Sequence, residues 1–293
     1  MAILVGSETR VVVQGITGNQ GSFHTAQMLA YGTRVVAGTS PSRVGGREHG
    51  VPIFATVREA VEKEGANASV VFVPARFATD AALEAIDAGV GVLVLVPEHM
   101  PVQDTMAVLA FARRRGVTVV GPNTFGVLST EGRCKMGIPP NHIYRPGPVG
   151  LVARSGTLSY EIAASLSAAG LGQTTAVGIG GDPVAGLTFV DVLERFEADP
   201  ETRAVVMVGE IGGTAEEVAA EFIHRMTKPV VAYLAGRAAP PGKRMGHAGA
   251  IIERGRGTLE SKRRALTEAG ARVAEMPWEV AGLVREALGA RAG

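Results

Sequence analysis

The sequence predicts an α/β protein in which parallel sheets are covered by helices on both faces. Short apolar runs rich in β-branched residues alternate with longer amphipathic segments, and this alternation continues through both halves of the chain. Glycine-rich turns follow several of the short runs, as they do in doubly wound sheets. With 293 residues the chain is long enough for two domains.

In the first half, the apolar runs predict strands at Arg10–Gln14, Arg34–Gly38, Ala68–Val73, Val90–Val96 and Val117–Val120. The amphipathic segments between them predict helices at Ser22–Ala30, Val57–Lys63, Ala78–Ala88 and Val102–Arg115.

In the second half, strands are expected at Val149–Ala153, Thr174–Val177, Ala204–Val208, Val230–Leu234 and Arg272–Ala274. Helices are expected at Leu158–Ala169, Phe189–Ala198, Ala215–Met226, Leu259–Ala269 and Glu279–Leu288. Between the halves, residues 130–148 are rich in proline and glycine, which is typical of an inter-domain connection. We therefore expect domains at residues 1–128 and 149–293, joined by residues 129–148.

Composition narrows the class of protein. Hydrophobic residues make up 46% of the chain and charged residues 19%, as in a globular enzyme, and the net charge of +1 argues against recruitment to nucleic acid or membrane. The single cysteine, Cys134, suits a reducing compartment, and no apolar run reaches about 18 residues. We expect a soluble, cytoplasmic protein without a metal site of its own.

One histidine stands among small residues, in the segment Gly-Lys-Arg-Met-Gly-His-Ala-Gly-Ala at 242–250. Backbone and ligand can approach the His247 ring closely there, and two cations, Lys243 and Arg244, precede it. Because an imidazole nitrogen is a competent nucleophile near neutral pH, the segment indicates a histidine that becomes phosphorylated. A glycine-rich loop with a structural histidine is the alternative that the local sequence leaves open.

The turn after the first predicted strand reads Gly-Ile-Thr-Gly-Asn-Gln-Gly at 15–21. Such a turn at the start of a helix presents backbone N–H groups to a phosphate, although tight strand-to-helix packing would also explain the glycines. Its spacing is not the dinucleotide pattern G-x-G-x-x-G, and no acidic residue ends the second strand, so NAD is disfavoured. The sequence also lacks a P-loop, which places the nucleotide that phosphorylates His247 on another polypeptide.

Further turns follow the strands of the second half. Ser155, Gly156 and Thr157 offer N–H donors to an anion, and the two hydroxyls can cap the following helix. Glu210 ends an apolar strand, where it would fix the tautomer of a neighbouring histidine or form a salt bridge. Since the carboxyl ends of parallel strands share one edge, these turns and the His247 segment are expected to converge.

Four blocks of the sequence together resemble the α-subunit family of succinate–CoA ligase, also called succinyl-CoA synthetase. They are Ser-Gly-Thr-Leu at 155–158, Gly-Ile-Gly-Gly-Asp-Pro at 178–183, Gly-Glu-Ile-Gly-Gly at 209–213 and Lys-Arg-Met-Gly-His-Ala-Gly-Ala-Ile-Ile at 243–252. The resemblance covers nearly the whole length of the chain. It implies an N-terminal Rossmann-like CoA-binding domain and a C-terminal flavodoxin-like ligase domain.

The resemblance also implies roles for individual residues. His247 would be the phosphorylated histidine and Glu210 its supporting carboxylate. Tyr160 would contact the substrate, and the turn at Ser155, Gly156 and Thr157 would hold phosphate. The CoA-binding residues would be Thr17, Gly18, Asn19, Gln20, Arg43, Val96, Pro97 and Glu98.

The reaction implied is the formation of succinyl-CoA from succinate, CoA and ATP or GTP, through a phosphohistidine and an acyl phosphate. An ATP-grasp β subunit would carry the nucleotide and Mg²⁺, in an αβ or (αβ)₂ assembly. Departures from the family pattern gather around the CoA loop, where Ser-Pro-Ser-Arg at 40–43 replaces Thr-Pro-Gly-Lys. Malate or another short carboxylic acid is therefore the alternative substrate, and a CoA-binding regulatory protein is the alternative from another class.

Overall fold

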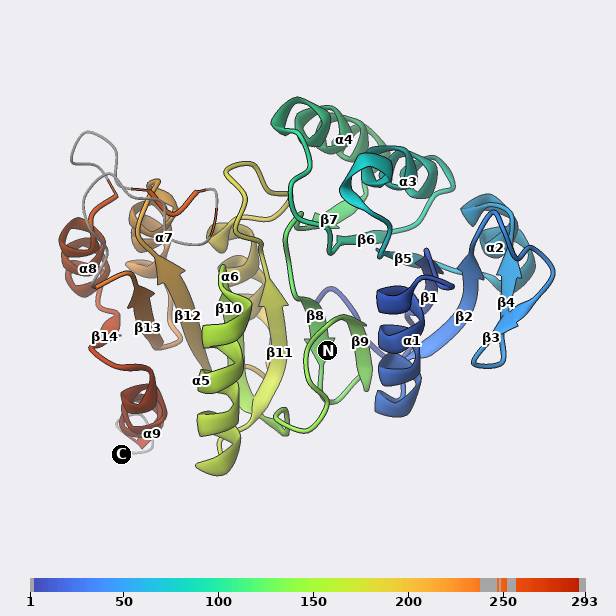
Figure 1. The fold of residues 1–293 in the computed structure, drawn as a ribbon. Coiled ribbons are helices and arrows are strands. Elements are labelled where there is room, and N and C mark those ends of the chain that lie inside the picture. The colour runs from blue at the N-terminus through green and yellow to red at the C-terminus, as the bar shows by residue number, and fades with distance from the viewer. Residues whose placement is uncertain (1–2, 238–246, 248, 252–256, 290–293) are drawn as a thin grey trace. The chain divides into compact units, whose positions relative to one another are not determined.

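The structure, a computed structural model, describes residues 3–237, 247, 249–251 and 257–289 (Figure 1). These residues form two compact units. One unit contains Leu4–Asn141 together with Val184–Leu187. The other contains Ile3, His142–Pro183 and the described residues from Thr188 onward. Each unit is built around its own sheet, as the alternating sequence pattern predicts.

The N-terminal unit contains a sheet with the strand order β3-β4-β2-β1-β5-β6-β7, in which β3 alone runs antiparallel to its neighbour. Its parallel strands follow the order 3-2-1-4-5-6 when numbered along the chain, which is the Rossmann order. The strands are β1 (Arg10–Gln14), β2 (Arg34–Thr39), β3 (Arg47–Glu48), β4 (Val51–Phe54), β5 (Ala68–Val71), β6 (Val92–Leu95) and β7 (Thr118–Val120).

The helices of this unit lie where the amphipathic segments predict them, with ends shifted by a few residues. They are α1 (Asn19–Tyr31), α2 (Val57–Glu64), α3 (Ala75–Asp87) and α4 (Val102–Arg115). A core of small and branched side chains, including Val12, Val71, Ala82, Ile86 and Leu93, lies between the sheet and helices α2 to α4. Alanines at 78, 81, 82 and 85 give α3 a narrow apolar face, which lets it pack closely on the strands.

Two pairs of strands in this unit are not predicted from the sequence. One is the short β3–β4 ribbon, and the other is the antiparallel hairpin of β8 (Gly126–Ser129) and β9 (Cys134–Gly137). Their sequences are typical of turns or of an inter-domain connection. Strands of two to four residues have too few alternations to be separated from loops by periodicity. At Gly126 and Gly137 the backbones approach so closely that a Cβ at Gly126 would lie 2.0 Å from the Met136 oxygen, so the glycines serve the pairing.

The second unit contains parallel strands in the order β14-β13-β12-β10-β11. When these five strands are numbered 1 to 5 along the chain, the order across the sheet, starting from β11, is 2-1-3-4-5, as in flavodoxin. The topological switch point lies between β10 and β12. The strands are β10 (Pro146–Ala153), β11 (Gln173–Gly178), β12 (Ala204–Glu210), β13 (Val230–Ala235) and β14 (Arg272–Ala274).

Two groups of helices cover this sheet (Figure 1). Helix α5 packs with α9, while α6, α7 and α8 pack side by side, as right-handed crossovers require in this strand order. The helices are α5 (Gly156–Ala168), α6 (Phe189–Ala198), α7 (Ala215–Ile223), α8 (Leu259–Glu268) and α9 (Val280–Gly289), with the short η1 (Pro277–Glu279) before α9. The predicted α/β class with doubly wound sheets is confirmed.

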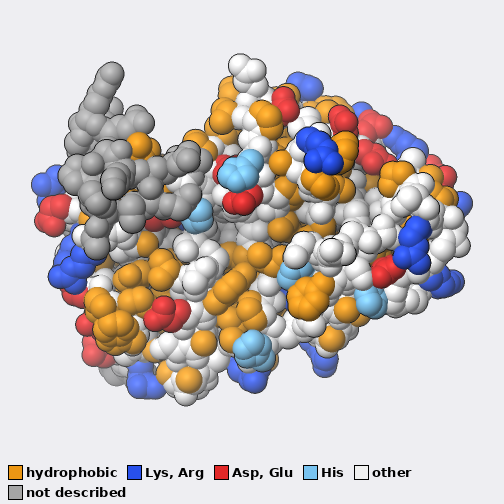
Figure 2. All heavy atoms as spheres, viewed as in Figure 1, with side chains coloured by type: hydrophobic (Ala, Val, Ile, Leu, Met, Phe, Trp, Pro, Cys, Tyr) orange, Lys and Arg blue, Asp and Glu red, His pale blue; other side chains and the backbone are white. Residues whose placement is uncertain are grey.

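The surface carries both signs of charge. Acidic, basic and hydrophobic side chains are interspersed over the face that Figure 2 shows, in keeping with the net charge of +1. Among the helices that the structure describes, none combines the length and the apolar character needed to cross a bilayer.

Candidate active site

The carboxyl ends of β10 and β12 meet at the switch point of the second unit. These strands are parallel neighbours, with Ala153 paired to Val208. Arg154 follows directly after β10, and its N–H donates to the Val208 carbonyl at 3.1 Å. Glu210 is the last residue of β12. The fold thereby sets a guanidinium beside a carboxylate at the sheet edge where ligands of doubly wound proteins bind.

His247 lies against this carboxylate. Its Nδ1 is 2.7 Å from Glu210 Oε2, so an N–H at Nδ1 donates to the carboxylate and Nε2 keeps its lone pair. The hydrogen bond to Glu210 raises the pKa of His247 above its ordinary value of 6.5, against a lowering effect of burial. The side chain of His247 is 26% exposed, whereas that of Glu210 is 6% exposed. The pair can therefore present one imidazole nitrogen as a nucleophile while the other is held.

A glycine makes room for the histidine ring. A Cβ on Gly181 would lie 2.4 Å from Cγ of His247, closer than two carbon atoms can approach. Gly249 has a similar relation to Arg154, because a Cβ there would lie 2.6 Å from a guanidinium nitrogen. Gly181 and Gly249 thus allow the ring and the guanidinium to pack on backbone.

A layer of buried charges lies behind the His247–Glu210 pair. Arg154 Nε is 3.3 Å from Glu210 Oε1, and one of its terminal nitrogens is 4.0 Å from Glu216 Oε1. Glu216, in the first turn of α7, forms an ion pair with Lys262 of α8, and both side chains are completely buried. Burying four charged groups together is tolerated only because each one has an opposite charge beside it.

The turn after β10 differs from expectation in one respect. Ser155 is the N-cap of α5, but its side chain makes no capping hydrogen bond, so the predicted hydroxyl cap is wrong for Ser155. The Ser159 hydroxyl instead donates to the Gly156 carbonyl at 2.6 Å. Thr157 is exposed, while Tyr160 is half-buried one turn further along α5, and burial raises the pKa of its phenol.

In the N-terminal unit, the glycine-rich turn occupies the switch point between β1 and β5. Gly15 has φ +79° and its N–H donates to the Thr39 carbonyl at 3.1 Å, while Gly18 precedes the first turn of α1. A Cβ on Gly21 would lie 2.0 Å from the Gly15 oxygen, so the turn needs glycine there. Gly18, Asn19 and Gln20 are exposed, which leaves the N–H groups of the helix start open to an anion.

The other residues assigned to CoA lie on neighbouring strand ends of the same unit. Thr17 Oγ1 is 2.7 Å from Ser40 Oγ, after β2. The Arg43 side chain is about half exposed and pairs with Glu48 at 3.1 Å. Val96, Pro97 and Glu98 follow β6, where the Pro97 carbonyl accepts the Asn123 N–H at 2.9 Å. Topology therefore gathers the predicted CoA residues at one edge of the sheet.

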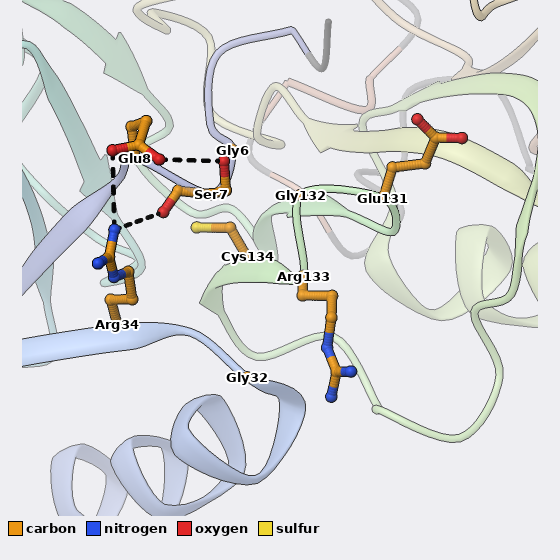
Figure 3. A pocket seen from close by; sticks show the side chains of 9 residues that line it. All are labelled: Gly6, Ser7, Glu8, Gly32, Arg34, Glu131, Gly132, Arg133 and Cys134. Carbon is orange, nitrogen blue, oxygen red and sulfur yellow. Dashed lines mark hydrogen bonds and ion pairs between the residues drawn. The ribbon is translucent and has the colours of Figure 1, made fainter.

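A separate pocket of about 370 Å³ lies at the opposite ends of these strands (Figure 3). Residues before β1, at the start of β2 and in the β8–β9 turn line it, and Arg34 pairs there with Glu8. None of the predicted site residues lines this pocket. Among the described residues, His, Cys, Asp and Glu side chains form no cluster of three suited to a metal.

The site also contains Glu216, Lys262 and Arg154, which no sequence motif identifies. In the sequence Glu216 reads as an ordinary acidic residue of a first helical turn, and Lys262 as a surface lysine of a polar helix. One feature of the sequence does indicate that cations lie near Glu210: the long apolar run of β12 ends in this residue, and a carboxylate buried there needs positive charges beside it.

Comparison with known proteins gives the family. Residues 6–99 match the CoA binding domain family, and residues 152–272 match the CoA-ligase family. The α subunit 2 of ADP-forming succinate–CoA ligase from Archaeoglobus fulgidus is 58% identical, over 98% of this chain and 100% of its own length. The α subunit from Methanothermobacter thermautotrophicus is 57% identical, over 99% and 98%. The chain belongs to the succinate–CoA ligase α-subunit family.

Members of this family are α subunits of a two-subunit ligase, so a β subunit is the expected partner. Among solved structures, an ATP citrate lyase from Methanothrix soehngenii, in complex with citrate and coenzyme A, matches with a TM-score of 0.89 at 26% identity. The match covers 99% of this chain but 51% of the lyase chain. The structural likeness therefore extends over almost all of this chain and over about half of the lyase chain.

Proposed function

We propose that this protein is the α subunit of an ADP-forming or GDP-forming succinate–CoA ligase, and that His247 is its phosphorylated residue. The observation that carries the proposal is the 2.7 Å contact between His247 Nδ1 and Glu210 Oε2 at the switch point of the ligase unit. Full-length relatives with 52–58% identity bear the name of this enzyme. The CoA residues at the edge of the N-terminal sheet support the same assignment.

Three group transfers follow from this assignment. His247 Nε2 attacks the terminal phosphorus of the nucleotide, and the nucleoside diphosphate leaves. A carboxylate oxygen of the acid then takes the phosphoryl group, which restores the imidazole and gives an acyl phosphate. The CoA thiolate attacks the acyl carbon and phosphate leaves, after the thiol proton has been lost. Glu210 balances the positive charge that the ring acquires when phosphorus is attached to Nε2.

The other predicted site residues have roles in this scheme. Ser155, Gly156 and Thr157 would receive phosphoryl oxygens at the start of α5, and Tyr160 would face the acid. The turn at 17–20, Arg43 and residues 96–98 would bind CoA. An ATP-grasp β subunit would bring ATP or GTP with Mg²⁺, in an αβ or (αβ)₂ assembly, and the complex would work in the cytoplasm.

The test uses this chain purified together with its β subunit. Incubation with γ-labelled ATP or GTP and Mg²⁺ should label the α chain in an acid-labile form, and later addition of succinate and CoA should discharge it as succinyl-CoA. A His247→Asn complex should take up no label. A panel of acids including malate decides the substrate, while a wild-type complex that takes up no label would contradict the proposal.

A further inference from the structure

The main chain of Glu210 is held from both sides by charged side chains. Its N–H donates to Glu216 Oε1 at 3.1 Å, and its carbonyl accepts from Lys262 Nζ at 2.8 Å. Glu216 comes from α7 and Lys262 from α8, so two helices fix the last residue of β12. Hydrogen bonds to charged groups are stronger than those between neutral groups, which makes this a rigid attachment.

Lys262 also fixes the turn that follows. Its Nζ donates to the Gly212 carbonyl at 2.5 Å, in addition to the Glu210 carbonyl and the Glu216 carboxylate. A Cβ on Gly212 would lie 2.2 Å from the Gly249 oxygen, so this turn packs directly on the backbone beside His247. One ammonium therefore connects the end of β12 with the segment that carries the histidine.

The cluster is balanced in charge. Arg154 and Lys262 carry two positive charges, and Glu210 and Glu216 carry two negative charges. A buried ion pair contributes little to stability compared with apolar side chains of the same size, so stability alone is a weak reason for four charges here. Their geometric effect is specific, because three of them contact the fourth, Glu210, at its N–H, its carbonyl and its carboxylate.

We propose that Lys262 and Glu216 are positioning residues for the phosphorylation of His247: they hold the backbone of Glu210 so that its carboxylate stays on Nδ1 and Nε2 stays available. This inference rests on the proposed function, since it assigns the two residues to the phosphohistidine step. Neither residue is placed to contact substrate, because both side chains are fully buried.

The experiment compares the wild-type αβ complex with Lys262→Met and Glu216→Gln. Lys228→Met is the matched control, because Lys228 Nζ likewise donates to two carbonyls, those of Phe196 and Asp199, in the same unit but away from His247. Single-turnover labelling gives the phosphorylation rate and its dependence on nucleotide concentration. We expect Lys262→Met to lower the saturated rate about tenfold or more with an unchanged KM for nucleotide, since the reacting nitrogen is displaced but the nucleotide site is not.

A second measurement does not depend on phosphorylation. The pKa of His247 is followed by ¹⁵N NMR of histidine-labelled α chain in the complex, with the His247→Asn spectrum for assignment. Among the residues that the structure describes, the charged groups that face the ring are Glu210, Arg154 and Asp182. Removal of the Lys262 charge alone would raise this pKa slightly, whereas release of Glu210 lowers it toward 6.5. A lowered pKa in Lys262→Met is therefore the expected result.

The outcomes separate the two proposals. If folded Lys262→Met and Glu216→Gln complexes are labelled at the wild-type rate, or if Lys228→Met loses as much rate as they do, the positioning role is refuted. If Lys262→Met does not fold, Glu216→Gln decides. It keeps an acceptor for the Glu210 N–H but removes the charge that pairs with Lys262 beside the Glu210 carbonyl, so its phosphorylation rate should fall as well. A wild-type complex that takes up no label refutes the proposed function instead, and the NMR measurement still decides whether Lys262 positions Glu210.

Discussion

His247 Nδ1 lies 2.7 Å from Glu210 Oε2, and the same carboxylate lies 3.3 Å from Arg154 Nε through its other oxygen. One buried carboxylate is therefore shared between a ring that gains charge during the reaction and a guanidinium that is always charged. Such sharing fixes the tautomer of the ring before any ligand arrives.

The first prediction concerns pH. Because the hydrogen bond to Glu210 raises the pKa of His247, the ring stays protonated to a higher pH than a free histidine, and only the unprotonated Nε2 attacks phosphorus. The phosphorylation rate should therefore rise with pH through a midpoint above 6.5. Glu210→Gln should lower this midpoint and the maximal rate, as measured by single-turnover labelling between pH 5 and 9. An unchanged midpoint in the variant would show that Glu210 does not control the ring.

The second prediction concerns Gly181. Gly181→Ala would place a Cβ 2.4 Å from His247 Cγ, so the ring must move by about 1 Å or more. Displacement of that size costs a reacting group about a hundredfold in rate. Quench-flow labelling of the complex measures the loss.

Gly282→Ala is the control for this variant, because Gly282 is an exposed residue of α9 with no atom within 4 Å of its Cβ position. It should keep the wild-type rate and gain about 0.5–1 kcal/mol of stability. Equal rates for Gly181→Ala and wild type would mean that the ring has room that the structure does not show.

The third prediction concerns CoA. Arg43 is exposed and paired only with Glu48 among the contacts described for it, so it can turn toward a phosphate of CoA. Arg43→Ala should weaken CoA binding about tenfold at low salt, and the deficit should shrink as salt is added, because the lost interaction is between charges at the surface. Calorimetric titration at two salt concentrations checks this. Arg58→Ala, which removes an exposed ion pair with Asp87, should leave CoA affinity unchanged.

The fourth prediction concerns Lys135 of the N-terminal unit. Its ammonium is buried and donates to the Pro139 carbonyl and Asn141 Oδ1, and burial lowers its pKa to about 8. Between pH 8 and the ordinary pKa of 10.5 the unfolded chain binds this proton and the folded chain does not, so stability rises with pH over that interval.

Urea unfolding of wild type and Lys135→Met at pH 7.5 and 10 measures this contribution. The wild type should gain up to about 3 kcal/mol relative to the variant at the higher pH, from about 1.4 kcal/mol per unit of pKa change. A constant difference between the two proteins would show that Lys135 titrates normally in the folded state.

Most strands of both sheets could be predicted from the sequence because they carry strong local signals. Long runs such as Ala204–Val208 are apolar throughout, and each is followed by a glycine-rich turn and an amphipathic helix, so the pattern specifies strand, turn and helix in order. The turn at 15–21 and the segment around His247 were recognisable for the same reason: glycine, histidine and their spacing are local properties.

Tertiary structure alone decided which charges meet. The partners come from three different elements: Arg154 follows β10, Glu216 lies in α7 and Lys262 lies in α8. Nothing in the local sequence of α8 distinguishes Lys262 from a solvated lysine. They meet because the strand order brings β10 beside β12 and packs α7 against α8. The sequence by itself determined the fold class and the reactive histidine, since periodicity and residue type act locally. The support of that histidine depends on distant contacts such as those of Glu210 with His247, 37 positions away, and with Lys262, 52 positions away, which only the folded chain brings together.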